Sequence, residues 1–294
     1  MNTGKTKNLG VMGWPIAHSL SPAMQQAAIE QAGIDYSYVA LPVEPEKLPQ
    51  AVEGLKALNF SGWNVTIPHK RAIMPLLDEI DEDAVIIGAV NTVVNREGQL
   101  KGYNTDMLGF LSPLQEKGVK LAGARALILG AGGAARAVLW GLLRSGVAAV
   151  TLAVRTPEKG ESLAEEFRSR TEADITVCAF GSEAFRKAEA EADILVNTTP
   201  LGMTPKVEEA PPVDWDSVKA SAFVYDIIYT PAETRFLREA REHGCAIQNG
   251  EAMLAGQGAA ALALWTGIEP DATCMCCALR EELSKQGNRG CVTK

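Results

Sequence analysis

The chain has 294 residues, of which 47% are hydrophobic and 22% charged, and its formal net charge at pH 7 is −8. This length suffices for two domains with a core each, and the negative charge argues against non-specific binding to nucleic acid, which depends on basic patches. Because no apolar run approaches the roughly 18 residues of a membrane helix and the N-terminus lacks the pattern of a signal peptide, we expect a cytoplasmic protein without nucleic-acid or membrane partners.

Strand and helix patterns alternate along the first part of the chain, which is typical of α/β folds. Ser21 and Pro22 are expected to open a helix, as an N-cap serine followed by proline at the first helical position, and Gly33 to close it. Glu97 and Gly98 form the turn of a predicted hairpin. The strands expected here span residues 9–12, 36–41, 62–67, 92–95 and 100–103, and helices span 46–58 and the residues from Pro68 onward.

A second α/β series follows a helix predicted at residues 106–118. Strands are expected at 126–129, 149–154, 194–196, 223–228 and 245–247, and helices at 134–144, 252–265 and 271–285. Since no repeat or flexible linker interrupts the pattern, we expect two α/β domains around a cleft that binds the ligands. The predicted substrate-binding domain comprises residues 1–105 and 258–294, and the predicted Rossmann-type dinucleotide-binding domain comprises residues 106–257.

A glycine-rich turn joins the strand at 126–129 to the helix after it. Gly130 allows the tight turn, Gly132 lets the backbone approach a pyrophosphate, and the small Ala135 allows close packing of helix on strand. The helix N-terminus offers free N–H groups and the positive end of its dipole to phosphates. This pattern predicts a dinucleotide site, with a plain tight turn as the alternative.

The end of the next strand indicates which dinucleotide binds. NAD-binding folds usually carry Asp or Glu there for the ribose 2′-hydroxyl, whereas this chain continues as Val154, Arg155 and Thr156, with Lys159 shortly after. A guanidinium and an ammonium suit a 2′-phosphate. We therefore predict NADP as the cofactor, the alternative being an ordinary surface arginine.

Four polar segments interrupt the apolar pattern of the first domain, at residues 13–22, 64–70, 88–92 and 102–106. Each lies where a strand ends or a helix begins, which is where ligands gather in open α/β sheets. Singly, each has a structural explanation, since Ser21 could cap a helix and Asn91 could belong to a turn. Lys70 and Asp106 could likewise form a purely structural ion pair.

Together these segments resemble the substrate-domain motifs of the shikimate dehydrogenase family in order, composition and spacing. The most specific are N-V-T-x-P-H-K at 64–70 and G-x-N-T-D at 102–106, and motifs at 197–203, 226–231 and 250–257 extend the resemblance over about residues 8–280. It implies reversible reduction of 3-dehydroshikimate to shikimate by NADPH, in chorismate and aromatic amino acid biosynthesis. One departure is Val154, where the family usually has asparagine, and it favours a relaxed choice between NADP and NAD.

The resemblance also implies roles for individual residues. Lys70 and Asp106 would form the catalytic pair, because a ketone that receives a hydride becomes an alkoxide and needs a proton donor or a positive charge. Hydroxyl and amide side chains would bind the substrate: Ser19, Ser21, Asn64, Thr66, Asn91, Tyr229 and Gln257. The cofactor would contact Gly130, Ala131, Gly132, Gly133, Ala134, Val154, Arg155, Thr156, Lys159, Ile227 and Gly250. His18 and His69 are interpreted as supporting or capping residues.

Three other functions stay open. One is a shikimate/quinate dehydrogenase with dual substrate or cofactor use, although Ser19 and Ser21 favour shikimate. Another is a related amino-acid or folate dehydrogenase, which would not need the motifs around Lys70 and Asp106. The third is a non-catalytic regulator, which should have lost one of those two residues or gained a basic extension. The sequence does not decide between a monomer and a homodimer.

Cysteines cluster near the end of the chain, as the C-x-C-C run at 274–277. Zinc sites of the ribbon type need paired C-x-x-C spacings or a nearby histidine, which this segment lacks. We expect no metal site and interpret the cysteines as small apolar fillers and tail residues. The six are Cys178, Cys245, Cys274, Cys276, Cys277 and Cys291.

Overall fold

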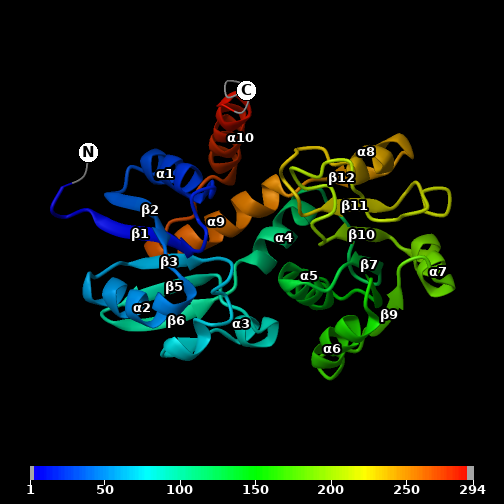
Figure 1. Ribbon diagram of the computed structural model, residues 1–294, viewed down its shortest axis with the longest axis horizontal. Helices are drawn as coiled ribbons and strands as arrows, with labels where there is room; N and C mark the ends of the chain where they lie inside the picture. Colours follow the sequence, from blue (N-terminus) through cyan, green and yellow to red (C-terminus); the bar gives the residue numbers. More distant parts are fainter. Residues whose placement is uncertain (1–2, 290–294) are drawn as a thin grey trace. The chain divides into compact units, whose positions relative to one another are not determined.

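The computed structural model describes residues 3–289, and it has the α/β architecture that the sequence predicts, with two six-stranded sheets. The chain divides into two compact units, Met1–Gly109 with Leu254–Lys294 as the first and Phe110–Met253 as the second. Each unit contains one of the sheets (Figure 1). The two junctions lie within helices α4 (Asp106–Glu116) and α9 (Glu251–Thr266).

The first unit has a mixed sheet with the strand order β2-β1-β3-β5-β6-β4. Strand β1 pairs in parallel with β2 and β3, while β5 runs antiparallel to β3 and β6. Its elements are β1 (Lys7–Gly13), α1 (Ser21–Gln31), β2 (Tyr36–Pro42), η1 (Pro45–Lys47), α2 (Leu48–Ala57), β3 (Gly62–Val65), η2 (Met74–Leu76), β4 (Glu79–Ile80), α3 (Glu82–Ile87), β5 (Thr92–Arg96), β6 (Gln99–Tyr103) and α10 (Ala272–Arg289).

Two local predictions for this unit were wrong. No α-helix begins at Pro68, because the carbonyl of Lys70 accepts a hydrogen bond from the backbone N–H of Val90 at 2.8 Å and is thereby withdrawn from a helical ladder. Turns and the short 3₁₀ helix η2 follow instead. Ser21 is not the N-cap of α1, since Leu20 holds that position and the Ser21 N–H donates to the hydroxyl of Ser19 at 3.3 Å.

The core of the first unit combines residues from both parts of the chain that form it. Leu9 pairs in one buried cluster with Leu262 and Trp265 of α9. The indole N–H of Trp265 donates to the Val93 carbonyl at 2.8 Å, and it lies where a side chain at Gly62 would stand, 2.2 Å from an added Cβ. Glycine at position 62 therefore lets α9 pack directly on strand β3.

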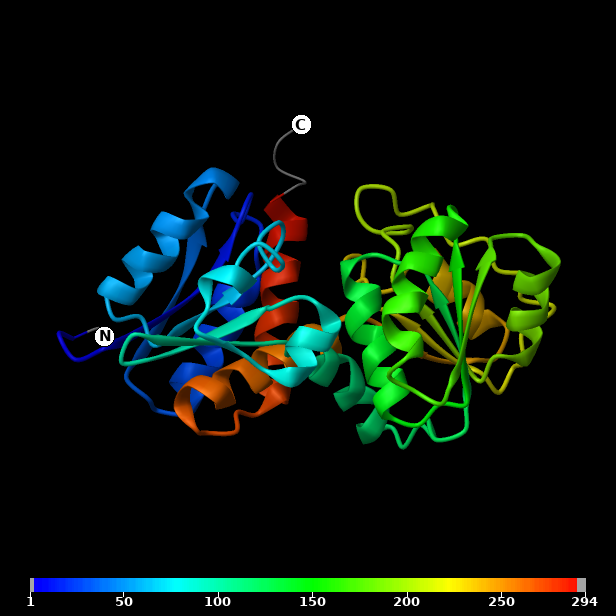
Figure 2. The same ribbon diagram turned by 90° about the horizontal axis from the view of Figure 1, so that it is seen from below.

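The second unit has a sheet with the order β12-β11-β10-β7-β8-β9, in which every pair of neighbours is parallel. Helices cover both faces (Figure 2). The order reverses between β7 and β10, where ligands bind in doubly wound folds. Its elements are β7 (Arg125–Leu129), α5 (Gly133–Arg144), β8 (Ala149–Val154), α6 (Pro157–Arg168), β9 (Asp174–Ala179), α7 (Glu183–Glu191), β10 (Ile194–Asn197), β11 (Phe223–Asp226), α8 (Arg235–Glu242) and β12 (Ala246–Gln248).

Two of the cysteines, Cys178 and Cys245, are buried in the apolar core of the second unit, where burial raises the pKa of the Cys178 thiol to about 11. Cys274, Cys276 and Cys277 lie on α10 with their sulfurs unbridged, and Cys291 lies outside the described residues. Among residues 3–289, no group of three potential ligands could hold a metal ion, and no helix is long and apolar enough to cross a membrane.

Candidate active site and cofactor pocket

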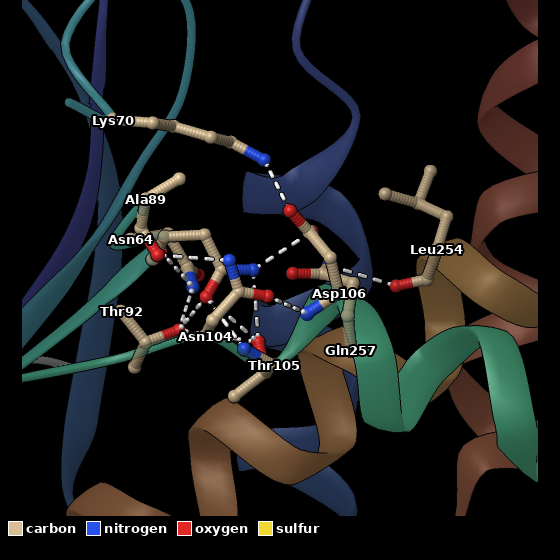
Figure 3. A network of polar contacts seen from close by, with 10 residues as sticks. Asn64, Lys70, Ala89, Thr92, Asn104, Thr105, Asp106, Leu254 and Gln257 are labelled. Carbon is tan, nitrogen blue, oxygen red and sulfur yellow. Dashed lines mark hydrogen bonds and ion pairs between the residues drawn. The ribbon is translucent and has the colours of Figure 1, made fainter. Parts of the chain in front are cut away.

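A lysine–aspartate ion pair stands at the carboxyl end of strand β3 in the first unit. Lys70 follows β3, and Asp106 is the first residue of α4. The Lys70 Nζ lies 2.5 Å from Oδ2 of Asp106 (Figure 3). The two side chains are 29% and 17% exposed, so a ligand can reach the charged atoms while much of each side chain is held by the protein.

Asn91 fixes the other oxygen of the aspartate. Its Nδ2 donates to Oδ1 of Asp106 at 2.8 Å and to the Thr105 hydroxyl at 3.0 Å. Its Oδ1 accepts from the Thr105 N–H at 2.8 Å and from the Thr92 hydroxyl at 2.9 Å. Since Asn91 is only 2% exposed, this buried network holds the Asp106 carboxylate in one orientation before any substrate arrives.

The beginning of α4 is held by a second asparagine. Asn104 accepts from the Asp106 N–H at 3.1 Å and donates to the Ala89 carbonyl at 2.9 Å (Figure 3). An acidic residue in the first turn of a helix is stabilised by the positive end of the helix dipole. The start of α4 therefore positions the Asp106 carboxylate.

Asn64 connects this network to the core. It accepts from the hydroxyl of Tyr38 at 2.6 Å and donates to the Thr92 hydroxyl at 3.0 Å and to the Asn91 carbonyl at 3.2 Å. Burial raises the pKa of Tyr38, which keeps its hydroxyl a donor. The structure thus brings Asn64, Asn91, Lys70 and Asp106 together, as the polar segments in the sequence suggest.

The other predicted substrate residues lie on several elements. Ser19 and Ser21 are partly exposed at the start of α1, and the backbone of Thr66 donates to the Met12 carbonyl at 2.9 Å. Gln257 on α9 donates to the Leu254 carbonyl at 2.8 Å (Figure 3). Tyr229 belongs to the second unit, where burial raises the pKa of its hydroxyl. None of these hydrogen bonds involves Lys70 or Asp106.

His69 is buried beside the pair. Its Nε2 lies 2.7 Å from the Val43 carbonyl, and the residue is 1% exposed. A ring held in this way anchors the backbone next to Lys70, in keeping with the supporting role that we expected. His18 is exposed.

The second unit contains a pocket of about 790 Å³ at the glycine-rich turn. Gly130 has a φ of 106°, and an added Cβ would lie 2.9 Å from the Thr198 hydroxyl, so this position needs glycine for the fold itself. At Gly132 and Gly133 an added Cβ would meet nothing within 4 Å. Their lack of side chains leaves open space in front of the N-terminus of α5, which suits a pyrophosphate.

The pocket lining includes most of the predicted cofactor residues and a second wall that the sequence did not predict. The predicted ones are Gly130, Ala131, Gly132, Val154, Arg155, Thr156 and Lys159. The others are Phe180, Thr198, Thr199, Pro200, Leu201, Met203, Thr204, Pro205, Lys206, Glu209 and Pro212. The only sequence signal for this wall is the 197–203 motif, which follows strand β10 at the point where the sheet order reverses.

Gly133, Ala134, Ile227 and Gly250 are not part of this lining. Gly250 has a structural reason to be glycine, since an added Cβ would lie 2.0 Å from the carbonyl oxygen of Ile227. Its N–H donates to the Ile228 carbonyl at 2.9 Å. Contacts of these four residues with the cofactor stay predictions.

Three cations reach the pocket. Arg155 is exposed just after β8 and Lys159 is exposed in the first turn of α6, and Lys206 forms a 3.0 Å ion pair with Glu209 on the second wall. Val154 is 5% exposed. Two cations beside a strand tip without a carboxylate fit a 2′-phosphate.

Comparison with known proteins gives concordant matches along the chain. The model of the shikimate dehydrogenase substrate binding domain matches residues 11–93, that of shikimate/quinate 5-dehydrogenase matches residues 113–209, and that of the shikimate 5′-dehydrogenase C-terminal domain matches residues 250–275. A curated relative, shikimate dehydrogenase (NADP(+)) of Symbiobacterium thermophilum, is 49% identical over 265 residues, which are 90% of either chain.

Solved structures are similar over nearly the same length. Shikimate 5-dehydrogenase from Listeria monocytogenes, in complex with shikimate and NAD, has a TM-score of 0.90 and 36% identity, with coverage of 96% of this chain and 98% of that one. The 5-ketofructose reductase of Gluconobacter sp. strain CHM43 has a TM-score of 0.88 and 37% identity, with coverage of 95% and 99%. The same fold therefore also occurs in a protein that is named a 5-ketofructose reductase.

Proposed function

Because the chain belongs to the shikimate dehydrogenase family, we propose that it reduces 3-dehydroshikimate reversibly to shikimate with Lys70 and Asp106 as its catalytic pair. It is an oxidoreductase that acts on a CH–OH group and uses NADP. The observation that carries the assignment of the pair is the partly exposed contact of Lys70 with Asp106, whose second oxygen is fixed by Asn91.

Lys70 supplies the proton in this proposal. Bound NADPH provides the hydride, and the carbonyl oxygen of the substrate gains negative charge as the hydride arrives. The Lys70 ammonium has three N–H groups, of which one points to Asp106, so the others can face that oxygen and donate a proton to it. In the oxidation of shikimate, neutral Lys70 would accept the hydroxyl proton instead.

Asp106 orients the lysine rather than moving a proton itself. Its Oδ2 receives the Lys70 hydrogen bond and its Oδ1 the Asn91 hydrogen bond, so both oxygens of the carboxylate are held in place. A positive charge held in place in this way stabilises the developing alkoxide without a rearrangement at the moment of reaction.

Substrate binding is assigned to neutral donors. We place the substrate carboxylate against the hydroxyls of Ser19, Ser21 and Tyr229, and its ring hydroxyls against the amides and hydroxyl of Asn64, Asn91, Thr66 and Gln257. The free Ser21 side chain supports this assignment, because α1 does not use it as a cap.

The second unit is assigned to the cofactor. The turn from Gly130 to Ala134 would hold the pyrophosphate, and Arg155, Thr156 and Lys159 would bind the 2′-phosphate, with Ile227 and Gly250 near the nicotinamide end. The open space at Gly132 and the exposed cations support this placement. The first unit would then be the substrate domain of a cytoplasmic monomer or homodimer.

Initial rates with four substrate–cofactor pairs test the function. Shikimate and quinate are each supplied with NADP and with NAD, and the reduced nicotinamide is followed by its absorbance. We expect the highest rate with shikimate and NADP. Quinate is the second candidate, because the family model matched at residues 113–209 names both substrates. Turnover of quinate alone would overturn the assignment, and faster reaction with NAD would remove the role given to Arg155.

A further inference from the structure

A fully buried carboxylate stands at the end of strand β11, in the second unit. Asp226 is 0% exposed and accepts three hydrogen bonds. Its Oδ1 receives the Asn197 amide at 3.1 Å and the Ile228 N–H at 3.0 Å, and its Oδ2 receives the Thr234 hydroxyl at 2.6 Å. All three partners are neutral donors.

Two of these bonds close the loop that carries Tyr229. Ile228 lies at the start of the loop and Thr234 at its end, so one carboxylate holds both ends. The Thr234 hydroxyl also accepts from the Leu237 N–H at 3.3 Å and thereby caps α8. The loop between strand β11 and helix α8 is thus tied to a single point in the core.

The third bond leads to the wall of the cofactor pocket. Asn197, whose amide donates to Asp226, accepts with its Oδ1 from the N–H of Thr199 at 3.0 Å and from its hydroxyl at 2.7 Å. Thr199 lines the pocket. A further bond, from the Thr204 N–H to the Thr230 carbonyl at 3.0 Å, joins the same wall to the Tyr229 loop.

This arrangement is costly for stability. Burial raises the pKa of Asp226 to about 6, against the lowering effect of the Thr234, Ile228 and Asn197 hydrogen bonds. A buried carboxylate without a cationic partner pays a desolvation penalty that hydrogen bonds offset only in part. A carboxylate accepts at every lone pair, whereas an asparagine would turn an N–H₂ group toward one of the three donors. The three donors around residue 226 therefore need a side chain that accepts a hydrogen bond at both of its terminal atoms.

We propose that Asp226 is a positioning residue of the reaction, which through Asn197 and Thr234 holds Thr199 against the cofactor and Tyr229 against the substrate. This inference rests on the proposed function of the chain. Asp226 takes no part in the proton transfer at Lys70, which belongs to the other unit. Its loss therefore weakens binding and leaves the protonation behaviour of the catalytic pair as it was.

The test compares Asp226→Asn with Glu189→Gln in the full-length chain. Glu189 is the matched control, since it is a fully buried carboxyl in the same unit, accepts from the Asp214 N–H, and does not line the pocket. We measure the Kd for NADPH by fluorescence, the KM for both ligands, and the pH profile of kcat. Asp226→Asn should raise the Kd and both KM values about tenfold or more, which is about 1.4 kcal/mol of binding. Glu189→Gln should leave them unchanged.

Kd and KM values that are unchanged in Asp226→Asn, or raised equally in both variants, would overturn the proposal, and so would a shifted pH profile of kcat. If Asp226→Asn does not fold, Thr234→Val and Thr234→Ser replace it, because serine keeps the donor and valine removes it. Thr234→Val should weaken ligand binding and Thr234→Ser should restore it, and equal behaviour of the two contradicts the positioning role. The NADPH Kd needs no turnover, so it separates this result from a failure of the proposed reaction.

Discussion

Replacement of Asn91 by aspartate tests the network behind the proposed catalytic pair. The change is nearly isosteric, but it replaces the Nδ2 that donates to Asp106 at 2.8 Å with an oxygen that has no proton to give. Two carboxyl groups then face each other. At low pH a shared proton between them reproduces the original hydrogen bond, and at high pH the two negative charges repel.

The size of the effect follows from this distance. Two unit charges about 2.8 Å apart repel by about 6 kcal/mol at an effective dielectric constant of about 20. The neighbouring Lys70 ammonium and small movements of the side chains reduce this energy. If about 3 to 6 kcal/mol remains, the carboxyl pair of the variant keeps its shared proton until about pH 6 to 8. We expect kcat of Asn91→Asp to fall at least about tenfold, relative to the unmodified chain, as the pH rises through this window.

The assay is shikimate oxidation at saturating substrates across that window, expressed as the ratio of variant to unmodified kcat. Asn95→Asp is the control. Asn95 is also buried in the first unit, but its amide donates to the Phe60 carbonyl at 2.8 Å and faces no carboxylate. Its ratio should not change with pH. A constant ratio for Asn91→Asp, in a variant with an intact fold, would refute the role of Asn91 in holding Asp106.

Three further changes test other parts of the structure. Lys70→Ala should lower kcat by about 10² to 10⁴ with little change in KM, because the loss falls on the transition state, and near-normal turnover in steady-state assays would exclude the lysine from the mechanism. Arg155→Ala should raise the KM for NADPH at least about tenfold more than that for NADH, and equal effects would show that Arg155 does not bind the 2′-phosphate. Glu189→Gln should flatten the pH dependence of stability: burial raises the pKa of Glu189 from 4.5 to about 7, so the folded state binds a proton that the unfolded state releases, and stability falls as the pH rises between these values. The fall is at most about 3 kcal/mol. The free energy of unfolding is measured with denaturant at each pH, and an equal dependence on pH in the variant and in the unmodified chain would contradict the prediction.

Features encoded in neighbouring residues were predicted from the sequence. The apolar strand before Gly130 and the helix after it follow from periodicity and turn chemistry, and the structure has both as β7 and α5. The hairpin at Glu97 and Gly98 is another such feature, with both residues at positive φ. The charged helices α6 and α7 stayed unassigned because their apolar faces are narrow.

Features that depend on distant contacts were not predicted. The helix expected from Pro68 fails because Lys70 bonds to Val90, and no local pattern reports that bond. The meeting of Lys70 and Asp106 was expected only through a family resemblance, and the role of Asn91 between Asp106 and Thr105 emerges from the geometry alone. Apart from Phe180, which follows β9, the second wall of the pocket at the glycine-rich turn is a loop without periodicity, so its lining residues had no signal beyond a motif.

The first unit is built from two segments that are far apart in the chain, and this has a consequence for its synthesis on the ribosome. Trp265 packs on the ring of Tyr38, whose hydroxyl holds Asn64 and, through it, the backbone of Asn91. Lys70 and Asp106 are translated early, but this support arrives only with α9, after the whole of the second unit has left the ribosome. We expect the second unit to fold first, and a nascent chain that ends before α9 to contain both Lys70 and Asp106 while lacking the core that aligns them.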